Sequence, residues 1–431
     1  MSWLNLISLL GCVSFVALAW LVGGCRRPFP ARTVIGASTL LLTLGAAVFW
    51  LPPMRFVLLA VNRLVLALLD ASAAGAEYLF GPLALGPGRS TAAGEPSVGF
   101  VLATQVLPAV IFFAALMAAL YHVGLLQPLV RWLGRLFHRT LGLSGAEALA
   151  GSANVFFGVE SAAAVRPYLE RMTRSELLTL LTCGMSTVAS TTLAIYVLFL
   201  RDPFPGIAGH LISASLLSIP AAAMMAKLIL PETGQPETRG SVPPPAAAER
   251  YGNSMAALAA GAMDGLRLAA GIATLLIAVL GLVAVVDLAL AWASAPWAGG
   301  PLNLSRLLGW LFTPLAWLLG IDAAEVPAAG RLLGERIIRT EVVAYQQLAA
   351  LAGESTLSRR TMVVLSYALC GFTHVASMGI FVGGFAALAP SRRDDLAALG
   401  PRALAGATLA TLLTGALAGL FYAGQAGLLG G

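Results

Sequence analysis

Long apolar segments separated by short polar stretches run through the whole chain. A membrane-crossing helix needs roughly 20 predominantly apolar residues to span about 30 Å of hydrocarbon. The segments that meet this requirement are residues 3–24, 33–51, 98–124, 176–200, 207–229, 255–291, 361–388 and 403–424. The pattern therefore predicts an all-α polytopic membrane protein with eight transmembrane helices.

Two further segments are apolar but interrupted by polar and charged residues. The first is 144–168, and its interruptions are Gly151, Asn154, Gly158 and Glu160. The second is 326–352, which carries several charges and ends its charged part at Glu341. Irregular backbone at membrane depth is tolerated only where protein buries it or where it lines a cavity. We therefore predict two re-entrant helical hairpins.

Three other stretches fit neither description. Residues 54–82 mix charges with apolar residues at helical spacing, which is typical of a helix lying at the membrane interface. Residues 304–320 form another apolar stretch that we also place at the interface. Residues 231–252 are polar and contain three consecutive prolines, which predicts a linker between two halves of the chain.

Composition and charge support the membrane assignment. The chain is 58% hydrophobic and 11% charged, against about 25% charged residues in a typical soluble domain. The net charge of +6 comes from short basic flanks and indicates orientation, with no nucleic-acid partner expected. The basic loop 26–32 predicts a cytoplasmic position and an N-terminus outside, although Arg359 and Arg360 then break the rule. No basic residue precedes Arg26, so we expect a retained first span and not a cleaved signal.

One short sequence occurs twice. Residues 183–190 read Cys-Gly-Met-Ser-Thr-Val-Ala-Ser, and residues 370–377 read Cys-Gly-Phe-Thr-His-Val-Ala-Ser. Each copy follows a hairpin that carries a lone acid, Glu160 or Glu341. Matching interrupted segments in two halves of a membrane protein indicate the binding site of a transporter, and repeats of opposite topology suit alternating access.

The repeat divides the chain into four parts. The predicted parts are a scaffold with spans 1–3 and the interfacial helix (1–125), a first hairpin repeat (126–230), a linker with scaffold span 6 (231–303) and a second hairpin repeat (304–431). Counting spans places the first hairpin on the cytoplasmic side and the second on the outside. We expect the two repeats to form one transport domain.

The two lone acids are the first candidate site residues. A carboxylate at membrane depth costs about 2.5–3.5 kcal/mol on insertion scales, so it must face a cavity or a partner. Glu160 and Glu341 would accept hydrogen bonds from a polar solute, or bind a cation or a proton. For Glu341 the alternative is an ion pair with Arg336 or Arg339 along its own helix.

Oxygen ligands for a hard cation and one unusual histidine complete the candidates. Asn154 and Thr187 would supply an amide and a hydroxyl, with free carbonyls at the half-helix ends; alternatively, Asn154 bonds a neighbouring helix. His374 stands in the second copy where the first has Thr187. Beside Ser377 and opposite Glu341, it would bind solute hydroxyls or titrate near neutrality, or else serve packing.

No catalytic pattern is present in the sequence. Gly-x-Ser-x-Gly, His-Glu-x-x-His and phosphate-loop motifs are absent, and the four cysteines have no metal spacing. We therefore expect no enzyme activity and no cofactor. A membrane solute sensor or an intramembrane enzyme stays as the least favoured function.

At these residues the chain resembles the concentrative nucleoside transporters. The resemblance runs nearly end to end and is strongest at 107–117, 144–147, 166–177, 341–345 and 367–372. It implies a homotrimer in the bacterial inner membrane, with scaffold spans 1, 2, 3 and 6 and an elevator-like transport domain. It also implies import of a nucleoside coupled to sodium or, in some members, to protons.

The resemblance also implies roles for individual residues. The sodium site would be formed by Asn154, the Phe157 carbonyl, Thr187 and the Val188 carbonyl. The solute would be bound by Val159, Glu160, Thr192, Glu341, Phe372, His374 and Ser377, with Glu160 toward the base and Glu341 and Ser377 toward the ribose.

The chain departs from the family pattern at two places. The family's first hairpin usually reads Gly-Gln-Thr-Glu, whereas residues 158–160 read Gly-Val-Glu, one residue shorter. The family's ribose-contacting asparagine is His374 here. Changing buried donors changes selectivity, because unpaired polar groups are costly. The alternative function is therefore a proton-driven carrier of a modified nucleoside or a nucleobase.

Overall fold

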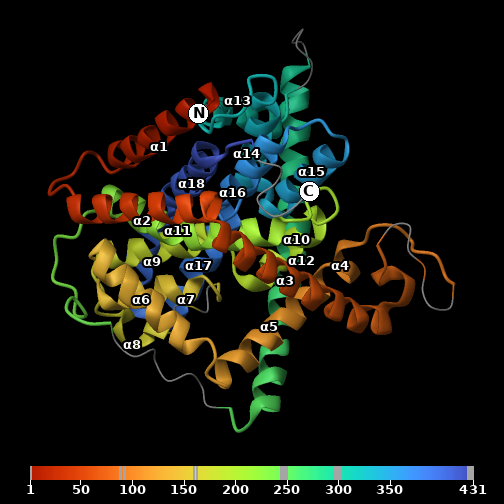
Figure 1. Ribbon diagram of the computed structural model, residues 1–431, viewed down its shortest axis with the longest axis horizontal. Coiled ribbons are helices and arrows are strands. Elements are labelled where there is room, and N and C mark those ends of the chain that lie inside the picture. Colours follow the sequence, from red (N-terminus) through yellow and green to blue (C-terminus); the bar gives the residue numbers. More distant parts are fainter. Residues whose placement is uncertain are drawn as a thin grey trace.

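The computed structural model describes residues 2–86, 90, 94–158, 161, 164–242, 251–295 and 302–424. Within these ranges the chain is helical, and the only β-type pairing is one isolated bridge between Ser90 and Pro96. Figure 1 shows the helices packed around α11 and α18. The predicted all-α polytopic architecture is confirmed.

Seven helical segments in the described ranges are long and apolar enough to cross a membrane. They are α1 (Trp3–Val22), α2 (Ala31–Trp50), α3 (Pro52–Phe80) with η1 (Gly81–Ala84), α4 (Leu102–Gln105) with α5 (Leu107–His122), α11 (Ile207–Ile229), α12 (Ser254–Ser294), and η3 (Pro390–Arg392) with α18 (Arg393–Phe421). Helix α3 covers the predicted interfacial segment, and its length and hydropathy also permit it to cross.

The order of helices occurs twice along the chain. The first set is α6 (Gln127–Leu141), α7 (Gly145–Asn154), α8 (Arg166–Leu169), α9 (Arg174–Ser186), α10 (Ser190–Leu200) and α11. The second set is α13 (Leu304–Leu318), α14 (Val326–Arg339), α15 (Glu341–Gly353), α16 (Arg359–Ala368), α17 (Val375–Leu388) and α18. In Figure 1, α6 to α9 lie at the lower left and α13 to α16 in the upper part.

Both spans that carry the repeated sequence are broken. The predicted span 176–200 consists of α9 and α10, and 361–388 consists of α16 and α17. The hydroxyls of Ser186 and Thr187 bond back to the Cys183 carbonyl at 3.2 and 2.9 Å. Side chains that bond the nearby backbone in this way compete with helix formation. Neither segment is therefore a continuous transmembrane helix.

Capping boxes start the first hairpin and the broken helix that follows it. Ser144 and Glu147 form a capping box at the start of α7, and Thr173 and Glu176 form one at the start of α9. The tip of the first hairpin, including Val159 and Glu160, lies outside the described residues. In the second hairpin a single residue, Thr340, separates α14 from α15.

Burial separates the helices of the repeats from the helix that joins them. The apolar windows of α11 and of the segment ending in α18 are 89% and 83% buried, whereas that of α12 is 12% buried. Helix α12 packs on α5, where Gly261 and Gly265 leave no room for a Cβ. Much of the remaining surface of α12 is exposed in the single chain. Helices α1 and α2 pack on α18 and α11, which belong to the repeats.

Candidate functional site

A cavity of about 80 Å³ lies between the two broken helices and α12. It collects residues that are far apart in the chain: Gly158 at the first hairpin, Ala189 and Thr192 at the first break, Thr340 to Val342 at the second hairpin, and Phe372, His374 and Ser377 at the second break. Five of the seven predicted solute residues thus line one cavity; the other two, Val159 and Glu160, are not described.

Glu341 is the buried acid of this cavity. Its side chain is 2% exposed, and Tyr196 donates its hydroxyl hydrogen to Oε1 at 2.9 Å. The Nε2 atom of His374 lies 3.0 Å from Oε2. The alternative ion pairs of Glu341 with Arg336 or Arg339 do not form. Arg339 pairs with Asp287 instead, and Arg336 donates to the Ala368 carbonyl. Glu341 therefore faces the cavity with partners from both repeats.

His374 caps a helix and contacts Glu341 at the same time. Its Nδ1 accepts the backbone N–H of Ser377 at 3.0 Å, which makes it the N-cap of α17. A ring nitrogen that accepts a hydrogen bond carries no proton, so the proton of the neutral ring lies on Nε2, the ring nitrogen that is 3.0 Å from Glu341 Oε2. The ring is thereby fixed in one tautomer and orientation.

Ser377 and Phe372 are held by the second break itself. The Ser377 hydroxyl accepts the backbone N–H of His374 at 3.3 Å and bonds the carbonyls of Phe372 and His374. The Phe372 ring meets the His374 ring edge-on, with centroids 6.4 Å apart. The hydroxyl of Ser377 is thus engaged in the local structure, and Phe372 and His374 form one wall of the cavity.

Thr340 was not among the predicted site residues. It lines the cavity, its φ of +87° with ψ of 159° lies in a region that is essentially confined to glycine, and its buried hydroxyl has no partner among the described residues. A β-branched residue with such a backbone is an outlier that clusters with functional sites. Residue type does not reveal backbone strain, so Thr340 could not be predicted from the sequence.

Two other parts of the cavity were also absent from the predicted site residues. Tyr196 lies in α10 and reaches Glu341 across 145 positions, a contact that no local pattern reveals. The apolar wall comes from Leu268, Ile272 and Leu276 of α12. Their spacing of four residues places them on one face of a helix, and this signal was available in the sequence.

The predicted cation residues meet at a second point of the same region. Asn154 ends α7, and its Nδ2 donates to the Cys183 carbonyl at 2.8 Å and to the Thr187 hydroxyl. Ser161 donates to the Asn154 Oδ1 at 3.1 Å. Val188 follows directly and is fully buried, with the Ser215 hydroxyl 3.3 Å from its carbonyl. Phe157 lies in the turn after α7.

Helix ends give these two points opposite electrostatic character. The C-termini of α7 and α9 meet at Asn154 and Thr187, where the negative ends of the helix dipoles favour a cation. The oxygen donors present there suit a hard ion such as sodium. The N-termini of α10, α15 and α17 meet at the cavity, where positive dipole ends favour the Glu341 carboxylate and polar solute groups.

The glycines of the repeated sequence explain how the two breaks pass each other. A Cβ on Gly371 would lie 2.9 Å from the Ser186 carbonyl, and one on Gly184 would lie 2.5 Å from the Phe381 ring. Each copy therefore needs glycine where it touches an element next to the other copy. This close approach brings the cation residues and the cavity into one site.

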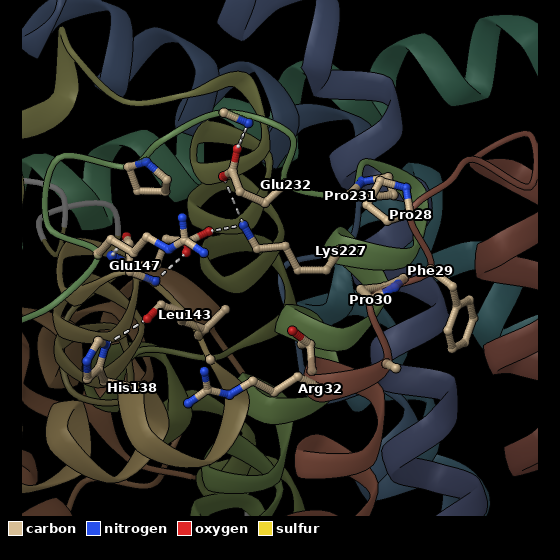
Figure 2. A pocket seen from close by; sticks show the side chains of 17 residues that line it. Pro28, Phe29, Pro30, Arg32, His138, Leu143, Glu147, Lys227, Pro231 and Glu232 are labelled. Atoms are coloured by element: carbon tan, nitrogen blue, oxygen red, sulfur yellow. Dashed lines mark hydrogen bonds and ion pairs between the residues drawn. The ribbon is translucent and has the colours of Figure 1, made fainter.

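A larger cavity, of about 450 Å³, lies elsewhere and contains none of the predicted site residues. Figure 2 shows Lys227 there between Glu147 and Glu232, at 2.5 and 3.6 Å. Lys227 also donates to the Ser175 hydroxyl at 2.9 Å. This buried network joins the starts of α7 and α9 to the end of α11, and we assign it to holding the first hairpin in place.

Models of known protein families match this chain along nearly its whole length. Three family models match: the Na⁺ dependent nucleoside transporter N-terminus at residues 10–83, nucleoside recognition at 103–202, and the Na⁺ dependent nucleoside transporter C-terminus at 210–419. These matches include every residue that lines the 80 Å³ cavity.

Curated relatives and solved structures point the same way. The chain is 37% identical to the uncharacterized transporter YutK of Bacillus subtilis, over 96% of this chain and 98% of that protein. It is 34% identical to the putative nucleoside permease NupX of Escherichia coli, over 96% and 98%. Its structure resembles CNTnw in an inward-facing substrate-bound state, with 34% identity, a TM-score of 0.86 and coverage of 97% and 98%. A CNTnw variant in an outward-facing state gives a TM-score of 0.87 at 33% identity, with the same coverage.

Proposed function

Because this chain belongs to the sodium-dependent, concentrative nucleoside transporter family, we propose that it imports nucleosides by secondary active, cation-coupled transport. It is a multi-pass protein of the bacterial inner membrane. The single observation that carries the proposal is the arrangement at the two breaks: a buried acid in a cavity at helix N-termini, beside oxygen donors at helix C-termini.

The solute's sugar would bind at the second break. Glu341 has a carboxylate that accepts hydrogen bonds, and ribose hydroxyls are donors that a buried acid recognises strongly. His374 orients Glu341 through Nε2 and reaches the same solute group. Thr192 and Phe372 complete the pocket wall. Val159 and Glu160 would contact the base from the first hairpin.

Sodium would bind at the first break. Asn154, Thr187 and the carbonyls of Phe157 and Val188 supply oxygen donors, and the ends of α7 and α9 supply negative partial charge. A bound ion would fix the first hairpin against α9 and so complete the solute pocket on that side. Coupling follows because each ligand then stabilises the same closed arrangement of the two breaks.

The transport step would move the repeats relative to α12. The cavity lies against Leu268, Ile272 and Leu276, which form a smooth apolar face on a helix that is otherwise little buried. A face without hydrogen bonds lets the site slide past it in an elevator-like movement. We further propose a homotrimer, with one site in each protomer.

The test is uptake of radiolabelled uridine and adenosine into proteoliposomes that contain the purified full-length protein. An inward sodium gradient should drive accumulation above the external concentration, and replacing sodium by choline should abolish it. Failure of both nucleosides to accumulate with a sodium gradient would reject the proposed function.

A proton-driven carrier of a modified nucleoside or nucleobase is the second candidate, because His374 contacts Glu341 inside the cavity. The cap on α17 argues against it: a second proton on the His374 ring would occupy Nδ1, which accepts the Ser377 N–H. Uptake that survives collapse of the proton gradient but not removal of sodium separates the two candidates.

A further inference from the structure

A buried arginine stands in the second repeat at the place where the first repeat has its cation residues. Arg336 lies in the last turn of α14 and is completely buried. Helix α14 opens the second hairpin as α7 opens the first, and Asn154 is the last residue of α7. Arg336 and Asn154 therefore occupy the same end of equivalent helices.

The contacts of the two side chains correspond. Asn154 Nδ2 donates to the carbonyl of Cys183, in the last turn of α9. Arg336 Nη1 donates to the carbonyl of Ala368, the last residue of α16, and to the Thr411 hydroxyl at 3.0 Å. In each repeat the first helix of the hairpin thus reaches the carbonyl end of the broken helix that follows.

The two side chains differ in charge. The end of an α-helix carries about half a negative elementary charge on its free carbonyls, which attracts a cation. Asn154 is neutral, so a positive charge at the ends of α7 and α9 would have to come from a bound ion. Arg336, on the last turn of α14, brings a guanidinium to the end of α16, and an arginine is always charged.

Arg336 is not explained by an ordinary ion pair. In the described part of the chain, no carboxylate lies within ion-pair distance of its guanidinium, and its Nε and Nη2 atoms have no hydrogen-bond partner. Burying an unpaired charge is costly, and a buried charge of this kind needs a reason beyond stability. The negative groups near it are the Ala368 carbonyl at the end of α16 and, beyond ion-pair distance, the Glu341 carboxylate.

We propose that Arg336 is a built-in cation that takes the place of a second sodium ion. The proposal rests on the proposed function, in which the first repeat binds sodium. The ends of α14 and α16 are then held together permanently, whereas the ends of α7 and α9 are held together only when sodium is present. One repeat therefore responds to the ion, and one sodium suffices for each solute.

The experiment measures uridine uptake by the full-length protein in proteoliposomes as a function of sodium, for the wild type, Arg336→Lys and Arg336→Gln. A single ion gives a Hill coefficient of about one, and two interacting ions give a value approaching two. We expect about one for the wild type and for Arg336→Lys. At low sodium, uptake by Arg336→Gln should be at least about tenfold lower than that of the wild type. Part of this uptake should return at high sodium, and the Hill coefficient should be above that of the wild type.

Arg360→Gln is the matched control. Arg360 is also a buried arginine that donates to carbonyls, those of Gly320 and Gly419, but it lies at the start of α16 and bonds Asn5 of α1. This variant should be less stable to heat and keep the wild-type Hill coefficient. Whether Arg336→Gln is folded is measured separately, by comparing its thermal stability in sodium with that in choline.

The outcomes separate the proposal from a packing role. A Gln variant that is stabilised by sodium more than the wild type supports the built-in cation even if its uptake is low. The proposal is overturned if the Gln variant keeps the wild-type sodium dependence, if it is unfolded equally in sodium and choline, or if Arg336→Lys behaves like Arg336→Gln. Absence of sodium-driven uptake by the wild type would instead reject the proposed function.

Discussion

The two copies of the repeated sequence have the same fold and different chemistry. The first copy contains the end of α9 and the start of α10, whereas the second begins just after the end of α16 and contains the start of α17. Each copy uses its glycine for a close approach beside the other copy. The first copy places Thr187 against Asn154 at helix C-termini, and the second places His374 against Glu341 at helix N-termini. We propose that the repeat sets the geometry, and that the difference between Thr187 and His374 helps to decide which copy binds the cation and which binds the solute.

The comparison is tested most severely by Glu341→Gln. Gln keeps the size of the side chain but removes the carboxylate that Tyr196 and His374 contact. The kcat/KM for uptake should therefore fall at least about 100-fold. Initial rates at saturating sodium measure the effect. The control is Glu354→Gln at the other, exposed end of α15, which should transport like the wild type. An effect of less than threefold for Glu341→Gln would remove this acid from the site.

The first copy is tested by Thr187→Ala. Loss of the hydroxyl removes one oxygen donor at the ends of α7 and α9, so half-maximal uptake should need about tenfold more sodium, equivalent to about 1.4 kcal/mol. Preference among nucleosides should not change. Thr182→Ala is the control, because this buried hydroxyl on α9 has no hydrogen-bond partner among the described residues. Equal sodium dependence of both variants would place the cation elsewhere.

The role of the second copy in binding the solute is tested by His374→Asn. Asparagine also caps helices well, so α17 should be retained and the structure preserved. Asn does not reproduce the contact of Nε2 with Glu341, so KM for uridine should rise by about three- to tenfold, the cost of about one hydrogen bond. Half-maximal sodium should stay at the wild-type value. An unchanged KM for uridine would mean that His374 does not act on the solute.

The smallest effect is expected for Tyr196→Phe. This change removes the Tyr196 contact of Glu341 and leaves the His374 contact in place. KM for uridine should therefore rise by about two- to tenfold, the cost of one hydrogen bond of about 0.5–1.5 kcal/mol. The ring still stacks on Tyr345, with centroids 4.3 Å apart, so stability should change little. A larger loss would show that the two repeats depend on this contact for their packing.

Much of the fold follows from hydrophobic periodicity, because lipid imposes it on every span. The predicted segments 33–51 and 207–229 agree with α2 and α11 to within two residues at each end. The breaks at 187–189 and 369–374 were marked by polar residues, but the sequence did not predict two separate half-helices. The division into scaffold and transport domains stays a prediction.

The site was predictable where residue type carries the chemistry and not where long-range geometry does. Glu341, His374 and Asn154 are unusual at membrane depth, and this drew attention to them. An ion pair of Glu341 with Arg336 or Arg339 was plausible on one helix. It does not form because Thr340 ends α14, with φ of +87°, before Glu341 begins α15.

The most direct measurement of the central claim is a paired titration of Thr187→Ala and His374→Asn. Half-maximal sodium is measured at saturating uridine, and KM for uridine at saturating sodium, so that each constant reports one ligand. The account predicts that Thr187→Ala changes only the sodium constant and that His374→Asn changes only the uridine constant. A change in the opposite constant for either variant, or equal changes in both, would contradict the assignment of cation and solute to separate copies.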